Sequence, residues 1–239
     1  MKKLLLTLSL FAILNGSELE TNLKNLFPTY DIISVDKINS MPNSNLIVLM
    51  EQNSNQKDII ISDNSGQNFF YVKNAFLRDK NDKELYNQKV KLVEDKVKEE
   101  VLELLKTIPD DRFITINSFY KNNKKTLYMI TDPECPDCRK EIDKLTKYLR
   151  NANLKIIFAP VHGKSSFTKA AIMLEKSKSM DSSNQQSYIE LFNTYYDEKC
   201  VVTDDMASDK QRQKVFFDAK LIFSKGLIKG VPFMVETEK

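Results

Sequence analysis

Two cysteines lie three positions apart in the sequence, Cys135 and Cys138, with Pro136 and Asp137 between them. Thiols at this spacing can close a disulfide with each other or exchange a disulfide with another molecule. The run before them, residues 126–131, is short, apolar and partly β-branched, which is typical of a strand buried on both faces. The pair is therefore expected just after a buried strand, where a helix begins.

The helix expected after this strand makes the two thiols unequal. Cys135 falls at the N-cap position, and Pro136 suits the first helical position, whose N–H has no partner in any case. The helix dipole and the unpaired N–H groups favour a thiolate at Cys135. Cys138 lies one turn before Ile142 and so falls on the apolar stripe of the helix. We therefore expect Cys135 to be the exposed, activated nucleophile and Cys138 to be the shielded thiol that resolves a mixed disulfide.

Acidic residues surround the first thiol, namely Asp132, Glu134 and Asp137. Negative charge near a thiol disfavours the thiolate and opposes the helix dipole. Pro136 and Asp137 are therefore predicted to tune the pKa of Cys135. The pair is predicted to be a weaker oxidant than the strongest dithiol oxidases.

Other uses of the cysteines have less support in the sequence. Zinc needs four ligands, and outside the pair only Cys200 and His162 could serve as soft ligands. We therefore predict no metal, and no cofactor beyond a redox-active Cys135–Cys138 disulfide. A purely structural disulfide would close too short a loop to add much stability. The odd Cys200 is either a small buried residue or a free thiol open to mixed-disulfide formation.

The chain starts with a cationic segment, residues 1–3, followed by an apolar run over residues 4–14. This run is too short to span a bilayer, which needs about 20 apolar residues in a helix. It is typical of a secretory signal, here predicted over residues 1–16, with an uncleaved anchor or a buried helix as the alternative. An exported protein works where disulfides persist.

The composition favours a packed protein and argues against one class of partner. Hydrophobic residues make up 41% of the chain, enough for a sizeable core. The net charge of +3 comes from interleaved basic and acidic residues rather than from a basic stripe. We therefore expect no nucleic-acid partner.

The pattern along the chain predicts two α+β units joined by a helix. Residues 17–84 contain one short amphipathic helix and four strand-like segments, as in a curved antiparallel sheet. Residues 85–108 carry apolar residues at helical spacing among Lys and Glu, which indicates a linker helix or, alternatively, a surface helix of one continuous domain. In residues 109–239, a strand, a helix and a second strand predict a parallel crossover. Three further helices and a final strand follow.

Four segments resemble the DsbC/DsbG family of periplasmic thiol:disulfide interchange proteins: residues 131–139 around the cysteines, residues 159–161, residues 166–174, and Gly230-Val231-Pro232. The resemblance implies a cystatin-like N-terminal dimerisation domain and a C-terminal thioredoxin-like α/β domain with a helical insertion. It also implies a periplasmic homodimer. Val231 and Pro232 match the family's cis-proline loop, which contacts substrate.

The activity that the resemblance implies is disulfide isomerisation or reduction of misfolded exported proteins. A membrane thiol–disulfide electron donor or acceptor would then maintain the pair Cys135–Cys138. Two alternatives stay open. One is a dithiol oxidase, which Val231 favours, because isomerases of the family commonly carry Thr before the cis-proline. The other is a chaperone that acts independently of its thiols.

The C-terminal end differs from the family's pattern. Only seven residues follow Pro232, whereas a thioredoxin fold adds another strand and a covering helix. We therefore expect a truncated C-terminus, with the last strand as an exposed edge. Such a chain should be less stable and more prone to aggregation than its relatives.

Overall fold

The computed structural model describes residues 17–52 and 56–238, which form two compact units divided at residue 95. The predicted signal sequence lies outside the described residues. The division falls inside helix α2 (Lys80–Lys106), which occupies most of the segment predicted as a linker. In the two described ranges, no helix has the length and apolar character needed to cross a membrane.

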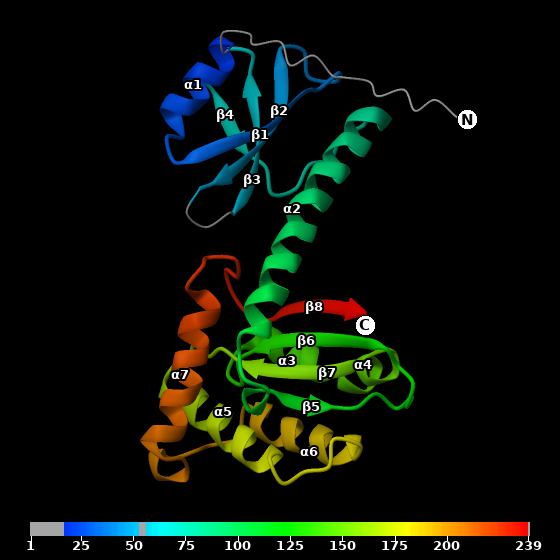
Figure 1. Cartoon of the computed structure of the whole chain (residues 1–239), viewed down its shortest axis with the longest axis vertical. Coiled ribbons are helices and arrows are strands. Elements are labelled where there is room, and N and C mark those ends of the chain that lie inside the picture. The colour runs from blue at the N-terminus through cyan, green and yellow to red at the C-terminus, as the bar shows by residue number, and fades with distance from the viewer. Residues whose placement is uncertain (1–16, 53–55, 239) are drawn as a thin grey trace, which may run out of the picture. The chain divides into compact units, whose positions relative to one another are not determined.

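The N-terminal unit is a helix followed by a four-stranded antiparallel meander. Neighbouring strands pair in chain order, β1-β2-β3-β4 (Figure 1). The predicted helix and all four strand-like segments are present, with ends shifted by a few residues. Their bounds are α1 (Glu18–Leu26), β1 (Tyr30–Lys37), β2 (Ser44–Glu51), β3 (Lys57–Asp63) and β4 (Phe69–Tyr71).

Strand β2 lies at the centre of this unit's core. Five consecutive residues of β2 are buried, because helices pack on both faces of the sheet. Leu23 of α1 packs with Ile47 and Leu49 on one face. Tyr86 of α2 packs with Val48 on the other.

The C-terminal unit is built on a mixed four-stranded sheet of order β5-β7-β6-β8. Strands β6 and β7 are parallel, as the predicted crossover requires, and the two edge strands are antiparallel to their neighbours. The strands are β5 (Ile114–Ile116), β6 (Lys125–Thr131), β7 (Asn153–Phe158) and β8 (Phe233–Glu238).

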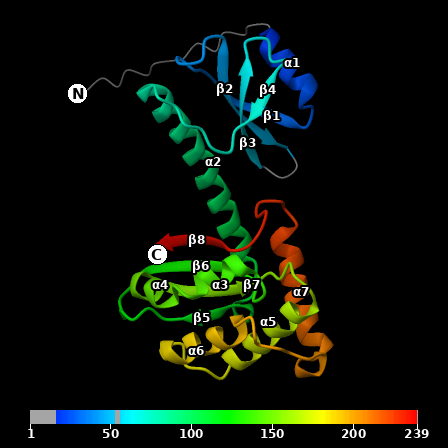
Figure 2. The ribbon, with the colours of Figure 1, turned by 180° about the vertical axis from the view of Figure 1, so that it is seen from behind.

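The helices of this unit cover both faces of the sheet. On the face seen in Figure 2, α3 (Pro136–Ile142) and α4 (Leu145–Asn151) pack through Ile142 and Leu149. The other face is covered by Leu105 of α2 and Ile222 of α7. The insertion between β7 and β8 consists of α5 (Lys164–Ser177), α6 (Gln185–Tyr196) and α7 (Asp209–Phe223), which are the three helices predicted there.

Two features of the unit differ from the predicted pattern. The edge strand β5 has three residues, too few to show a period of two. The helix after the cysteines is divided into α3 and α4, because Lys144 N–H bonds to the Glu141 carbonyl, one residue nearer than in an α-helix. Ile142 and Leu145 on either side of this break are both buried, so the apolar stripe survives it.

Candidate active site

Cys135 occupies the N-cap of α3, as predicted, and Pro136 is the first helical residue. The Cys135 thiol donates a hydrogen bond to the Val231 carbonyl, with 3.5 Å between Sγ and O. Because this backbone lies against the sulfur, Cys135 is 7% exposed, less than the open nucleophile that we expected. The prediction of an exposed thiol is therefore wrong, because Cys135 is largely buried.

Cys138 is fully buried, as predicted, in the apolar cluster under α3. Burial is the main cause that raises the pKa of Cys138, and a hydrogen bond to Cys135 also raises it. Hydrogen bonds from Thr131 and from the Asp132 backbone lower it, and the resulting pKa is about 12. The Cys138 thiol is therefore protonated at neutral pH and is directed at the Cys135 sulfur. The two sulfurs are in contact and have different surroundings, which is the arrangement needed for attack followed by resolution.

The segment before β8 contributes the backbone that faces Cys135. The peptide bond between Val231 and Pro232 is cis, the geometry that the resemblance implied. Both residues are half-buried, and Val231 packs against the apolar clusters on the two faces of the sheet.

Asp132, at the end of β6, is a buried carboxylate that the sequence did not single out for a structural role. Its Oδ1 accepts from Glu134 N–H at 2.8 Å and from the Ser166 hydroxyl. Its Oδ2 accepts from the backbone N–H groups of Val161 and His162, at 2.8 and 3.1 Å, and from His162 Nδ1 at 2.7 Å. These bonds tie the loop that carries Cys135 to α5 and to the loop between β7 and α5.

Glu134 is held by two cations. The ammonium of Lys169, a buried side chain of α5, lies 2.9 Å from one carboxylate oxygen. Arg139 of α3 lies 3.3 Å from the other and also binds Glu198 at 2.8 Å. The residue directly before Cys135 is therefore neutralised on both sides.

Asp137 points into solvent and pairs with Lys140 at 2.7 Å. This ion pair lowers the pKa of Asp137. Glu134 and Asp137 near Cys135 therefore have cationic partners, and Asp132 is held by hydrogen bonds. The acidic field inferred from the sequence is consequently smaller than predicted.

Three polar residues at this site were not singled out from the sequence, Ser166, Lys169 and Tyr196, and His162 was considered only as a metal ligand. Ser166 and Lys169 lie in the 166–174 segment, which carried the resemblance but had no assigned role. A lysine on the apolar face of a helix was the available signal, because such a side chain is rarely buried unless it is paired. The partner of that lysine could not be identified from spacing.

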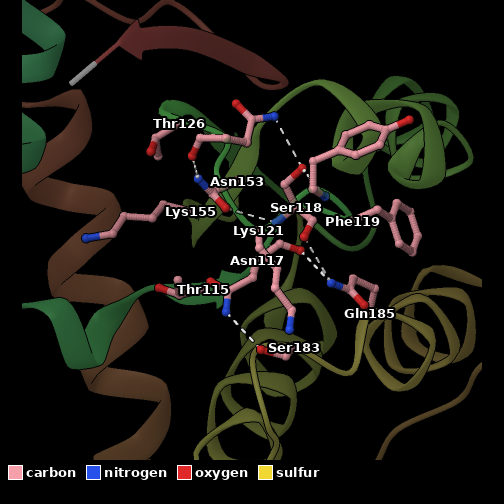
Figure 3. Close-up of a pocket in the computed structure, with 12 residues that line it drawn as sticks. Thr115, Asn117, Ser118, Phe119, Lys121, Thr126, Asn153, Lys155, Ser183 and Gln185 are labelled. Carbon is pink, nitrogen blue, oxygen red and sulfur yellow. Dashed lines mark hydrogen bonds between the residues drawn. The ribbon is translucent and has the colours of Figure 1, made fainter.

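One cavity of the C-terminal unit lies away from the thiols. It measures about 630 Å³ and includes Thr126 and Asn153, which stand at the beginnings of β6 and β7, whereas Cys135 follows the end of β6. Figure 3 shows that its amides are used internally: Asn153 Oδ1 accepts from Ser118 N–H at 2.9 Å, and Gln185 donates to the Asn117 carbonyl at 3.0 Å. These bonds brace the loop after β5.

Two further candidates from the sequence were the third cysteine and a metal site. Cys200 is half-buried, with a free thiol, and packs against the larger core cluster of its unit. Within the described part of the chain, no group of three or more His, Cys, Asp or Glu side chains is placed to hold a metal ion.

Comparison with known proteins places the fold. No family model and no curated protein matches the chain. DsbG from Helicobacter pylori is 22% identical, with a TM-score of 0.54, over 91% of this chain and 100% of that one. The catalytic domain of Proteus mirabilis ScsC is 18% identical, with a TM-score of 0.43, over 57% of this chain and 86% of that one. The chain has the fold of DsbG, and at that level the predicted resemblance and the α+β fold class are confirmed.

Proposed function

We propose that this chain is a thiol–disulfide oxidoreductase whose reacting pair is Cys135 and Cys138. The observation that carries the proposal is the arrangement of the two sulfurs: one at the N-terminus of α3 and the other one turn inside, buried and hydrogen-bonded to the first. A helix N-terminus favours a thiolate, and apolar burial disfavours one. The DsbG-like fold supports the same chemistry.

The reaction proceeds through a mixed disulfide. The Cys135 thiolate attacks one sulfur of a substrate disulfide, the substrate S–S bond breaks, and the other substrate sulfur leaves as a thiolate. Cys138 then attacks the Cys135 sulfur and releases the remaining substrate thiolate, so that the substrate gains two electrons and the pair becomes a disulfide. In isomerisation, a second substrate thiolate attacks instead, and the pair is regenerated in its reduced form.

The more specific form of the proposal is a periplasmic disulfide isomerase or reductase that acts on misfolded exported proteins. A membrane thiol–disulfide donor would keep the pair reduced. The likeness to DsbG spans most of both units, which favours this form over a catalytic domain acting alone. The N-terminal unit would supply a homodimer contact, since its aromatic side chains Phe70, Tyr71 and Phe76 are exposed.

A dithiol oxidase is the second candidate, and two observations favour it. Val231, not Thr, precedes Pro232. The acidic residues near Cys135 are paired with Lys140, Lys169, Arg139 and His162, so they oppose a Cys135 thiolate less than free charges would. A membrane acceptor would then reoxidise the pair.

Thiol trapping in cells tests both levels of the proposal. Rapid acid quenching followed by alkylation should find the pair mostly reduced if the chain is an isomerase or reductase, and mostly oxidised if it is an oxidase. A Cys138→Ala variant should accumulate clients as mixed disulfides on Cys135. A Cys135→Ala variant that captures as many clients would contradict the assignment of the nucleophile.

A further inference from the structure

Three buried side chains from three elements meet behind the nucleophile. Thr131 is the last residue of β6, Tyr196 is the last residue of α6, and Cys138 lies in α3. The hydroxyl oxygens of Thr131 and Tyr196 are 2.9 Å apart. The Thr131 side chain also hydrogen-bonds to Cys138. The hydroxyls and the thiol therefore form a continuous chain.

The single proton of the Thr131 hydroxyl limits the direction of these hydrogen bonds. Complete burial raises the pKa of Tyr196 well above its ordinary value, so its phenol keeps the proton, and between the two hydroxyls either can be the donor. When the Thr131 proton goes to the Cys138 sulfur, the Thr131 oxygen accepts from Tyr196. This order is the one in which Thr131 lowers the pKa of Cys138.

We propose that Thr131 and Tyr196 are positioning residues for the resolving step, in which an ordered Tyr196→Thr131→Cys138 hydroxyl chain stabilises the Cys138 thiolate. The inference rests on the proposed oxidoreductase function and adds residues to it. In this step Cys138 forms a bond to the Cys135 sulfur, the mixed disulfide breaks, and its electron pair leaves on the substrate sulfur. The proton released by Cys138 passes to the departing thiolate through solvent, and both hydroxyls keep theirs.

The other titratable groups around Cys138 do not replace the hydroxyls in stabilising the Cys138 thiolate. Cys135, on the same helix, raises the pKa of Cys138, but in the mixed disulfide it carries no thiolate, so that opposition is absent when resolution occurs. The Asp132 carboxylate, beyond β6, is engaged by His162 and Ser166, while its backbone N–H lowers the pKa of Cys138. Tyr196, on α6, is neutral. A buried thiolate with so few charges nearby depends on its hydrogen-bond donors.

Stopped-flow kinetics with dithiobis(nitrobenzoate), an aromatic disulfide that releases a coloured thiolate, tests the inference. The full chain is used in reduced form, with Cys200→Ser in every variant to remove the third thiol. Attack by Cys135 releases one coloured thiolate at a rate that depends on reagent concentration. Resolution by Cys138 releases a second at a rate that does not, and the pH profile of this second rate reports the ionisation of Cys138.

Thr131→Val should slow the second release roughly tenfold at neutral pH, as expected for a lost hydrogen bond to a charged group. The midpoint of its pH profile should move upward. Tyr196→Phe should act in the same direction but less strongly, and Thr131→Ser should restore behaviour close to that of the parent. The matched control is Tyr188→Phe, a buried tyrosine of the same helix whose hydroxyl bonds to the Met180 carbonyl, which should change neither release.

Unchanged second-release rates and pH midpoints in Thr131→Val and Tyr196→Phe would overturn the inference. If Thr131→Val does not fold, Tyr196→Phe decides by the same criterion. Slowing of both releases to the same extent would also overturn it, because a positioning role for Cys138 leaves the first attack unaffected. A parent chain that shows no second release would instead contradict the proposed redox pair itself.

Discussion

Asp132 has no exposed surface, yet five donors converge on its two carboxylate oxygens. Burial by itself raises the pKa of Asp132, but the hydrogen bonds from Ser166, His162 and the backbone outweigh it, and the net pKa is lowered. The carboxylate is therefore charged in the folded protein. Its role is to hold the Cys135 loop against α5 and the loop between β7 and α5.

Replacing Asp132 with Asn should destabilise the C-terminal unit. The amide nitrogen of Asn would face donors on at least one side, so buried N–H groups would lose their acceptor, at a cost of about 2 kcal/mol. Urea unfolding at neutral pH measures the loss. Asp137→Asn, an exposed change in the same loop, should leave the midpoint unchanged, and equal effects of the two substitutions would contradict the structural role.

The stabilisation from Asp132 should also depend on pH in a defined direction. Because its folded-state pKa lies below the ordinary value of 3.8, the contribution is complete well above that pH. It is lost as the pH falls through the lowered folded-state value. Unfolding curves of the parent and Asp132→Asn should therefore converge in acid, and a difference that widens on acidification would contradict the assignment.

For single residues, the sequence predicted the positions that follow from local geometry. The N-cap position of Cys135 and the burial of Cys138 depend on a strand and a helix that adjoin them in sequence. The partners of Asp132 come from the segment 161–166, about thirty residues away. Such contacts depend on tertiary packing, which spacing alone does not encode.

Helix α5 reaches the active site through Lys169, whose buried ammonium pairs with Glu134. Lys169→Met should leave Glu134 with Arg139 as its counterion and increase the negative field at Cys135. A Cys135 thiolate then becomes less favourable, and the reduction potential should fall by about 30 mV, or roughly tenfold in the equilibrium constant.

Equilibration with glutathione measures this shift. The matched control is Lys176→Met, an exposed lysine of the same helix, which should leave the potential unchanged. Lys169→Arg, which keeps the charge, should lie between the parent and Lys169→Met. A potential that rises in Lys169→Met would contradict the electrostatic account.

Most elements could be predicted because their apolar residues recur with a clear period. The helices α5, α6 and α7 and the strands β6 and β7 show this. The three-residue β5 and the break between α3 and α4 could not be found, because both arise from pairing and packing over a few residues. Periodicity continues across the break, since Ile142 and Leu145 face the same core.

The two units of the molecule each have their own core, and α2 contributes to both. Tyr86 and Val90 pack in the N-terminal unit, and Val101 and Leu105 pack in the C-terminal unit. The sequence indicated two units through the charged helix between them. The α+β class of each unit came from the pattern along the chain. The cystatin-like and thioredoxin-like topologies came from the resemblance, because strand order depends on contacts between distant segments.

The proposed homodimer can be tested on the whole chain by light scattering. The parent should have twice the chain mass of 27.7 kDa. Phe70→Lys combined with Phe76→Ser removes exposed aromatic surface from the N-terminal unit and should give a monomer. Phe217→Ser removes an exposed aromatic side chain from the C-terminal unit instead, and this variant should stay dimeric. A monomeric parent would contradict the dimer.

If Cys135 and Cys138 form one redox couple, equilibration in glutathione buffers of graded ratio should oxidise them together. Alkylation and peptide mapping then report each cysteine separately. We expect both to lose alkylation along one transition, set by the square of the reduced glutathione concentration over the oxidised, while Cys200 stays reactive. Thiols at 135 and 138 that remain alkylatable at every ratio in the folded protein, or that pair with Cys200, would contradict it.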